Sequence, residues 1–349
     1  MKRAKFSVFL VGMVLIFSLL LTPVTAESRD VVYFLSWGGT IQQTFEELGM
    51  AERFYEETGF RVVLVPKATT SEIIAQAMVQ RDNPQVDVIM CDVGPLASVA
   101  DQLLIDLDET MIPNFRYIMD EGIRSNHVFV STSTGILVYN PEWFEANNIS
   151  PPNSWADFLR PELAGKMLIQ NISNTYGLMV LVELARLGGG GESNIEPGFE
   201  KLAQIAPGVV DWPTTIVRYE QAFLSGEVVF ASQSWVDSTR MRNKGIPIER
   251  VMPKEGAFIN GSAAGIMRNA PNPEGAKAFL NFLLSEGYQK MQADTFARGS
   301  FNTRMVPDPD RAADLLSVEM MLQLRPFDWE TVTPLRREWQ ARFNRIVER

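Results

Sequence analysis

Four residues that could hold a polar ligand stand just after short apolar runs, at points where strands would end: Trp37, Asp92, Trp235 and Asp237. A tryptophan ring can stack on an apolar or cationic group, and a carboxylate can pair with an ammonium group. In an open α/β sheet, ligands bind beyond the carboxyl ends of the strands. We therefore expect these residues, with Gly38 beside the first tryptophan, at the mouth of a binding site. Two structural alternatives stay open: the tryptophans could pack in the core, and the aspartates could cap the turns that follow.

A second candidate group precedes the strongly apolar segment Leu178–Leu187, which is expected to be a helix that ends at Gly188–Gly191. Free backbone N–H groups at the start of such a helix can bind an anionic group. The residues placed there are Ser173, Asn174, Thr175 and Tyr176. Simple capping of the helix by these side chains is the structural alternative.

Motifs of catalytic or cofactor sites are missing from the sequence. It has one histidine, His127, which we expect to be a solvated surface residue. The sequence contains no Gly-x-Ser-x-Gly, His-Glu-x-x-His or Walker lysine motif, and the glycines after Trp37 lack the third glycine of a dinucleotide loop. We therefore predict a protein that is not an enzyme and that uses neither cofactor nor metal. A secreted hydrolase with two carboxylates is the alternative from another functional class.

Strand-like and helix-like segments alternate twice along the chain, which predicts an α/β fold with two lobes. Two segments of small polar and apolar residues, 131–140 and 258–267, are interpreted as crossover strands that act as a hinge. The expected division places residues 27–133 and 263–349 in lobe I and residues 138–258 in lobe II. A ligand cleft would lie between the lobes.

The N-terminus has the features of a secretory signal peptide. Three basic residues precede the uncharged apolar run Phe6–Leu21, and Val24-Thr25-Ala26 provides small residues for cleavage. Residues 1–26 are therefore predicted to be removed on export, which leaves 29 of the 32 basic residues against 42 acidic ones and a net charge of −13. Such an acidic protein repels nucleic acid and anionic lipid, so neither is an expected partner. The single cysteine, Cys91, lies in an apolar run and is expected to be buried.

The chain resembles the periplasmic solute-binding proteins of ABC importers, in the group that contains polyamine, ferric-iron, thiamine and phosphonate receptors. The resemblance covers essentially the whole predicted mature chain. It is carried by five stretches in the same order: Leu163–Met167, Leu187–Gly189, Ser225–Phe230, Pro253–Gly256 and Asn269–Ser285. It implies a two-lobed fold of the type II kind and a periplasmic, monomeric receptor. The receptor would trap a small-molecule solute at the hinge and pass it to a membrane permease with its ATPase.

The resemblance transfers the ligand less well than the fold. Trp37 and Trp235 match positions where polyamine receptors hold aromatic walls, but Ile259 and Gly261 stand where those receptors have an aromatic and an acidic residue. The adjacent tyrosine pair of iron receptors is also missing, with Tyr219 as the nearest match. The solute is therefore expected to be a small amine, polyamine-like or amino-acid-like. A carboxylate or phosphonate bound at residues 171–176 is the alternative.

Overall fold

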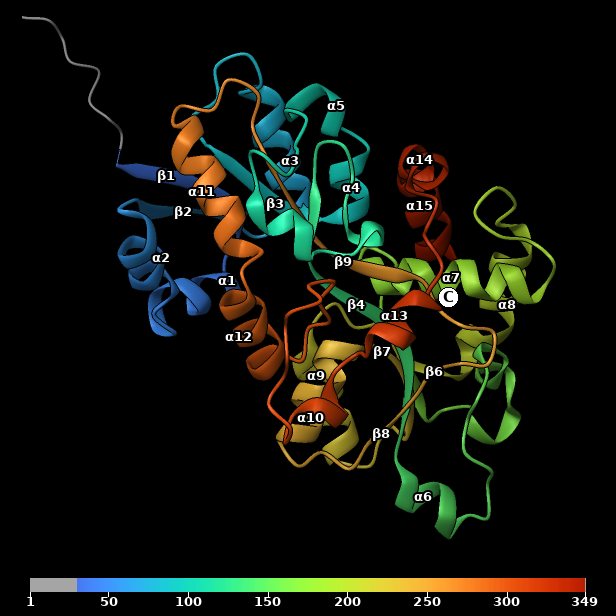
Figure 1. Ribbon diagram of the computed structural model, residues 1–349. Helices are drawn as coiled ribbons and strands as arrows, with labels where there is room; N and C mark the ends of the chain where they lie inside the picture. Colours follow the sequence, from blue (N-terminus) through green and yellow to red (C-terminus); the bar gives the residue numbers. More distant parts are fainter. Residues whose placement is uncertain (1–29, 349) are drawn as a thin grey trace, which may run out of the picture.

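A computed structural model describes residues 30–348, and the predicted signal peptide, residues 1–26, lies outside this range. The described chain contains a nine-stranded sheet in the order β2-β1-β3-β9-β4-β7-β5-β6, with β8 paired to β4 (Figure 1). The strands are β1 Val31–Trp37, β2 Arg61–Lys67, β3 Val88–Asp92, β4 Val128–Tyr139, β5 Met167–Leu168, β6 Val209–Asp211, β7 Phe230–Ser234, β8 Glu249–Val251 and β9 Ile259–Ile266.

Helices connect and cover these strands, and the alternation of strand and helix predicted from the sequence is confirmed. The α-helices are α1 Thr40–Gln42, α2 Met50–Thr58, α3 Thr70–Val79, α4 Val93–Ala97, α5 Ala100–Leu103, α6 Pro141–Ala146, α7 Thr175–Leu187, α8 Glu196–Ile205, α9 Ile216–Leu224, α10 Trp235–Asn243, α11 Pro273–Leu283, α12 Glu286–Phe296, α13 Val318–Leu322, α14 Trp329–Val332 and α15 Arg336–Val347. Shorter 3-10 or π turns are η1 Gln43–Glu47, η2 Pro113–Tyr117, η3 Asp120–Gly122, η4 Trp155–Leu159, η5 Pro161–Leu163, η6 Ala206–Gly208, η7 Ala312–Asp314 and η8 Thr333–Leu335. Within residues 30–348, none of the helices has the length and apolar character needed to cross a membrane.

Strand β4 joins the two halves of the sheet. The two segments interpreted as crossovers contain β4 and β9, the neighbouring strands at the centre of the sheet. The first part of β4, up to Thr134, pairs antiparallel with β9, and its last part, from Gly135, pairs with β7 and β8. On its other edge, β9 pairs with β3. Figure 1 shows β1, β2 and β3 on one side of this central pair and β6, β7 and β8 on the other. Residues on β4 and β9 therefore lie between the two halves.

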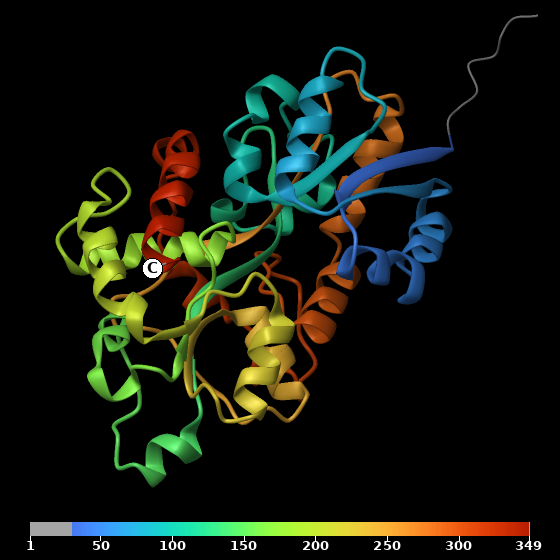
Figure 2. The ribbon, with the colours of Figure 1, turned by 180° about the vertical axis from the view of Figure 1, so that it is seen from behind.

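The C-terminal segment makes a further connection across the centre. The backbone of Arg325 accepts a hydrogen bond from Ile259 N (2.8 Å) and donates one to Ala257 O (2.9 Å), so it runs beside the start of β9. The chain then continues into α14 and α15, which lie beside α7 and α8 in both ribbon views (Figures 1 and 2). Trp339 and Phe343 of α15 belong to the same apolar cluster as the buried residues of α7 and α8. The lobe boundaries remain a prediction, but the end of the segment assigned to lobe I packs against elements of the other half.

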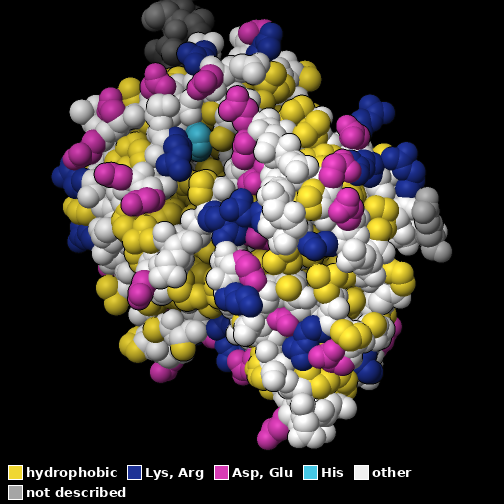
Figure 3. All heavy atoms as spheres, turned by 90° about the vertical axis from the view of Figure 1, so that its right-hand side faces the viewer, with side chains coloured by type: hydrophobic (Ala, Val, Ile, Leu, Met, Phe, Trp, Pro, Cys, Tyr) yellow, Lys and Arg dark blue, Asp and Glu magenta, His cyan; other side chains and the backbone are white. Residues whose placement is uncertain are grey.

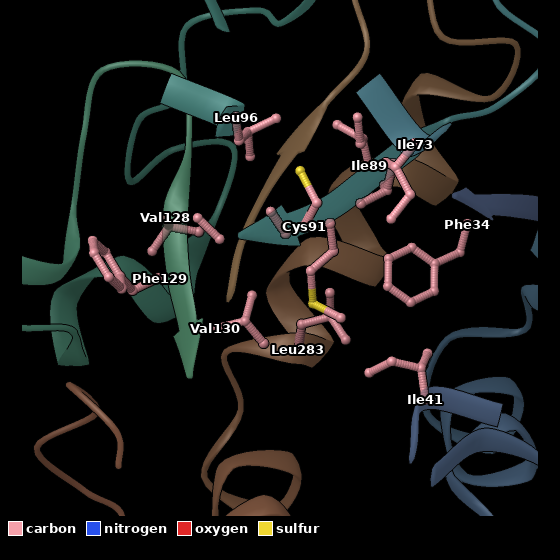
Figure 4. Close-up of a cluster of buried hydrophobic side chains, with 14 of the residues drawn as sticks. Phe34, Ile41, Ile73, Ile89, Cys91, Leu96, Val128, Phe129, Val130 and Leu283 are labelled. Atoms are coloured by element: carbon pink, nitrogen blue, oxygen red, sulfur yellow. The ribbon is translucent and has the colours of Figure 1, made fainter. Parts of the chain in front are cut away.

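A large apolar cluster lies against β1, β3 and the start of β4 (Figure 4). Phe34 of β1 is fully buried and packs edge-to-face on Phe279 of α11, with ring centroids 4.8 Å apart. Burial of each such side chain contributes about 2 kcal/mol to folding. Cys91 is buried in the same cluster, as predicted, and burial raises the pKa of its thiol well above the ordinary value.

The prediction that His127 is a solvated surface residue was wrong. The side chain is only 5% exposed, and its Nδ1 atom hydrogen-bonds with Oδ1 of Asn126 at 2.8 Å. Its position next to the first residue of β4 draws the ring inward, against the expectation from its polar neighbours. The outer surface, by contrast, carries acidic and basic side chains interspersed with apolar ones on the face shown in Figure 3.

Candidate ligand-binding site

A cavity of about 340 Å³ lies where the central strand pair meets the ends of β1, β3 and β7. Six of its lining residues belong to the crossover strands and are small or polar: Ser131, Thr132, Ser133, Asn260, Gly261 and Ser262. The others are contributed by strand ends, helix starts and the segment after α12: Trp37, Thr40, Asp92, Tyr176, Ser234, Val236, Asp237 and Arg298. The cavity is therefore polar at its centre and carries three ionisable acid or base side chains at its sides.

Asp92 ends β3, and a short hydrogen-bond chain orients its carboxylate. Trp37 Nε1 donates to Thr70 Oγ1 (3.2 Å), and the Thr70 hydroxyl donates to Asp92 Oδ2 (2.7 Å). Burial raises the pKa of Asp92, while the Thr70 hydrogen bond and the charge of Arg336 lower it in part. Within the described part of the chain, the Asp92 carboxylate has no ion-pair partner within 4.0 Å.

Asp237 lies in the first turn of α10, directly after β7. Ser234 caps this helix by accepting a hydrogen bond from Asp237 N (3.0 Å). Burial raises the pKa of the Asp237 carboxyl group, and the Ser234 hydroxyl and the charges of Arg240 and Arg298 lower it in part. Like Asp92, this carboxylate has no ion-pair partner within 4.0 Å among residues 30–348. The cavity thus holds two desolvated carboxyl groups that can accept from a cationic ligand.

Tyr176 enters the cavity from the first turn of α7. Asn174, and not the tyrosine, caps this helix. Asn174 Oδ1 accepts from Tyr176 N (2.9 Å), which leaves the tyrosine ring beside Gly135 of β4. Burial raises the pKa of Tyr176 to about 12, so its hydroxyl stays protonated near neutral pH. Its ring and that of Trp37 are the aromatic surfaces that line the cavity.

Arg298 is the functional candidate that the sequence analysis missed. It follows α12, whose C-cap residue, Ala297, has a left-handed backbone conformation with φ of 53°. The next residue, Gly299, pairs with Thr132 of β4 through two backbone hydrogen bonds of 2.8 and 3.0 Å. Arg298 Nη2 donates to Thr40 Oγ1 (3.1 Å), whereas its Nε atom is buried without a hydrogen-bond partner. Burial lowers the pKa of the guanidinium group, which marks a desolvated cation at the cavity wall.

Comparisons with known proteins show the family of this chain. The profile of the family described as "Bacterial extracellular solute-binding protein" matches residues 49–316, more than half of the sequence. This chain is a bacterial extracellular solute-binding protein.

Relatives and solved structures agree with this assignment. The spermidine/putrescine-binding periplasmic protein of Salmonella typhimurium is 25% identical, over 90% of this chain and 88% of its own. A solved ABC transporter structure from Clostridium perfringens superposes with a TM-score of 0.78 at 22% identity, covering 90% of this chain and 99% of its own. A spermidine/putrescine ABC transporter substrate-binding protein from Streptococcus pneumoniae gives a TM-score of 0.74 at 17% identity, covering 91% and 99%.

The family assignment confirms several sequence predictions. The two-lobed periplasmic binding protein fold is confirmed by the match to these structures. The solute-binding protein belongs to a non-catalytic family, so the prediction that it is not an enzyme is confirmed and the hydrolase alternative falls. Membership implies a solute and an ABC transporter that receives it. The absence of a metal stays a prediction, although no group of three or more His, Cys, Asp or Glu side chains among residues 30–348 could hold one. Tyr219, the nearest match to the tyrosine pair of iron receptors, is fully buried in the core.

The structure brings four of the nine predicted site residues to the cavity of the solute-binding protein: Trp37, Asp92, Tyr176 and Asp237. Gly38, Ser173, Asn174, Thr175 and Trp235 do not line it. Trp235 is only 6% exposed, because its Nε1 donates to Asp314 O (2.8 Å) and the Arg250 guanidinium stacks on its ring at 4.2 Å. It therefore packs in the core, as the structural alternative for the tryptophans supposed.

At the start of α7, where an anion site was predicted, asparagine side chains accept hydrogen bonds from nearby backbone N–H groups. Asn171 Oδ1 accepts from Ser173 N (2.9 Å), and Asn174 caps the helix. Gly38 N donates to Lys67 O (3.2 Å), which continues the pairing of β1 with β2. These residues support the walls of the cavity through the backbone. None of them belongs to the lining itself.

Proposed function

We propose that this protein binds a small solute that carries an ammonium group and delivers it to the permease of an ABC importer. One observation carries the proposal. Asp92 ends β3 and Asp237 follows β7, on opposite sides of the β9–β4 pair, and both half-buried carboxylates line one cavity without an ion-pair partner in the described chain. An ammonium group between them would replace the interactions with water that the carboxylates lose on burial.

The aromatic lining supports the same ligand class. Trp37 and Tyr176 present ring surfaces at the cavity, and an alkylammonium group is attracted to the face of such rings. Thr70 holds the Trp37 ring and the Asp92 carboxylate in one chain of hydrogen bonds, so both are oriented before a ligand arrives. The relatives named for spermidine and putrescine binding are consistent with an amine.

The centre of the cavity argues against a long polyamine held as in those relatives. Gly261 occupies the position where, by resemblance, polyamine receptors have an acidic residue. A Cβ atom at Gly261 would collide with the backbone oxygen of Ser131 on β4, so the close pairing of β4 and β9 excludes any side chain there. The proposed solute is therefore short, with Asp92 and Asp237 as the acidic groups that it contacts.

The proposed setting is the periplasm, reached through the predicted signal peptide, with the protein as a monomer. A ligand that contacts groups on both sides of the central strands stabilises the closed state, and closure at β4 and β9 presents that state to the permease. Periplasmic relatives support this location.

Isothermal titration tests the proposal with a panel of monoamines, diamines, amino acids, carboxylates and phosphonates. We expect an amine-bearing compound to bind, and Asp92→Asn and Asp237→Asn each to weaken it by about 10- to 100-fold, as expected for a charge-assisted hydrogen bond. Asp106→Asn, at an exposed position outside the cavity, is the matched control and should leave affinity unchanged. Binding of carboxylates or phosphonates alone, with no response to any amine, would contradict the proposal and favour the anionic alternative.

A further inference from the structure

Arg298 is the one basic side chain among the described residues that line the cavity. Its recorded polar partners are neutral hydroxyl groups: Thr40 Oγ1 at 3.1 Å and, at the limit of hydrogen-bond distance, Ser131 Oγ at 3.5 Å. No carboxylate of residues 30–348 lies within 4.0 Å of its guanidinium nitrogens. The Nε–H is buried without any partner.

Several other partly buried arginines among residues 30–348 are paired with acids. Arg250 lies 3.5 Å from an Asp314 carboxylate oxygen, and Arg325 pairs with the buried Glu183. Arg218 is held between Asp211 (2.9 Å) and Glu227 (2.7 Å). Arg298 and Arg336 are partly buried arginines with no carboxylate within 4.0 Å among the described residues, and of these two only Arg298 lines the cavity.

The backbone around Arg298 holds the side chain at this place. Ala297 has a left-handed conformation, which costs a non-glycine residue about 1 kcal/mol or more and so requires support from its surroundings. That support comes from Gly299, whose backbone pairs with Thr132 and whose lack of a side chain permits the approach, because a Cβ there would collide with the Thr132 hydroxyl. Arg298 is therefore anchored directly to the crossover strand β4.

We infer that the solute is zwitterionic, with its ammonium group at Asp92 and Asp237 and a carboxylate group at Arg298. This inference rests on the proposed function and adds the second charged group of the same ligand. Guanidinium and carboxylate form two parallel hydrogen bonds, which would use N–H groups that the Thr40 and Ser131 hydroxyls leave free. The solute class is that of small amino acids. Because the cavity has two carboxylates and one guanidinium, a diamino monocarboxylic acid matches all three charges.

Isothermal titration of the predicted mature protein, residues 27–349, with matched pairs of compounds tests the inference. Each pair consists of an amino acid and the amine that lacks its carboxylate, with chains of two to six carbons: for example 4-aminobutanoate with propylamine, and 2,5-diaminopentanoate with 1,4-diaminobutane. We expect the wild type to bind at least one amino acid about tenfold or more tightly than its amine. Arg298→Gln should remove this preference by weakening the amino acid, while the affinity for the amine stays equal or rises.

Two further variants separate the carboxylate contact from a general effect of charge or folding. Arg240→Gln removes a positive charge that also acts on Asp237 but lies outside the cavity lining, and it should keep the preference. Arg298→Lys retains the charge and should keep part of it. A wild type that binds the amines as tightly as their amino acids would overturn the zwitterion and leave the amine proposal standing. Failure of every amine-bearing compound to bind would overturn both, and the wild-type comparison decides the question even if Arg298→Gln does not fold.

Discussion

The contact between Gly94 and Trp329 is a sharp test of how the C-terminal segment joins the rest of the protein. Gly94 is the second residue of α4, two positions after Asp92, and Trp329 begins α14, which is 235 residues further along the chain. A Cβ atom placed on Gly94 would overlap three atoms of the Trp329 indole ring. Trp329 is only 7% exposed and packs against Phe327 in a tilted arrangement with ring centroids 4.6 Å apart, so it has little room to move.

The Trp329 ring can respond to Gly94→Ala in two ways, and the response that costs less free energy sets the expected loss of stability. If the ring shifts within its cluster, overpacking costs about 1–3 kcal/mol. If the ring leaves the cluster, the loss of about 150–250 Å² of buried surface costs about 4–6 kcal/mol at about 25 cal/mol per Å². We therefore expect the free energy of unfolding to fall by about 2 kcal/mol, measured by urea denaturation followed by tryptophan fluorescence and circular dichroism.

A double-mutant cycle isolates the contact from other effects of the substitution. In a Trp329→Ala background the space above residue 94 is vacated, so Gly94→Ala should cost less than about 0.5 kcal/mol there. Gly191→Ala is the matched control, since the nearest atoms to a Cβ at that position lie 3.9 Å away. An equal cost of Gly94→Ala in both backgrounds would refute the argument that α14 packs on α4.

Two pH-dependent effects follow from buried groups outside the cavity. Burial lowers the pKa of His127 from 6.5 to about 4, so the unfolded state takes up the proton first and stability falls as pH drops from 6.5 toward 4, by about 3 kcal/mol in total. Because the chain has one histidine, a single imidazole resonance in the NMR spectrum reports this pKa, and titration near 6.5 would show the interpretation to be wrong. Burial raises the pKa of Glu183 to about 7, against the opposing charge of Arg325. Its protonated form therefore adds stability below pH 4.5 that is lost as pH rises to 7, so urea unfolding should show the stability of the wild type relative to Glu183→Gln declining over that range; a difference independent of pH would argue against it.

Several parts of the fold could be predicted because they depend on local pattern. Apolar runs such as Arg61–Val65 and capped apolar segments such as Leu178–Leu187 became β2 and α7, since the spacing of apolar residues sets the face that each element buries. The crossovers were visible because small residues are needed where β3, β9 and β4 pair closely. The path of the C-terminal segment was not visible, because no local pattern records that Trp329 packs on Gly94.

In the candidate site, too, local pattern predicted some of the residues, and contacts between distant segments decided the others. Trp37, Asp92 and Asp237 were predicted because polar residues after buried strands point to one edge of a sheet. Trp235 was placed in the site by the same rule, but contacts with Arg250 and with Asp314, 79 residues further along the chain, hold its ring in the core. Its neighbour Asp237, two positions on, faces the cavity because α10 turns by about 100° at each residue.

By itself, the sequence determined the kind of protein: the α/β alternation, the two crossovers and the strand-end carboxylates all follow from residues close together in the chain. Only the tertiary structure decided which of the polar residues share a cavity. Arg298 belongs to a segment with no motif, and it becomes part of the site solely because Gly299 pairs with Thr132, more than 160 residues earlier. Local pattern controls which face of an element is buried, whereas the charge of a binding site depends on backbone contacts between distant segments, and a single sequence does not display these.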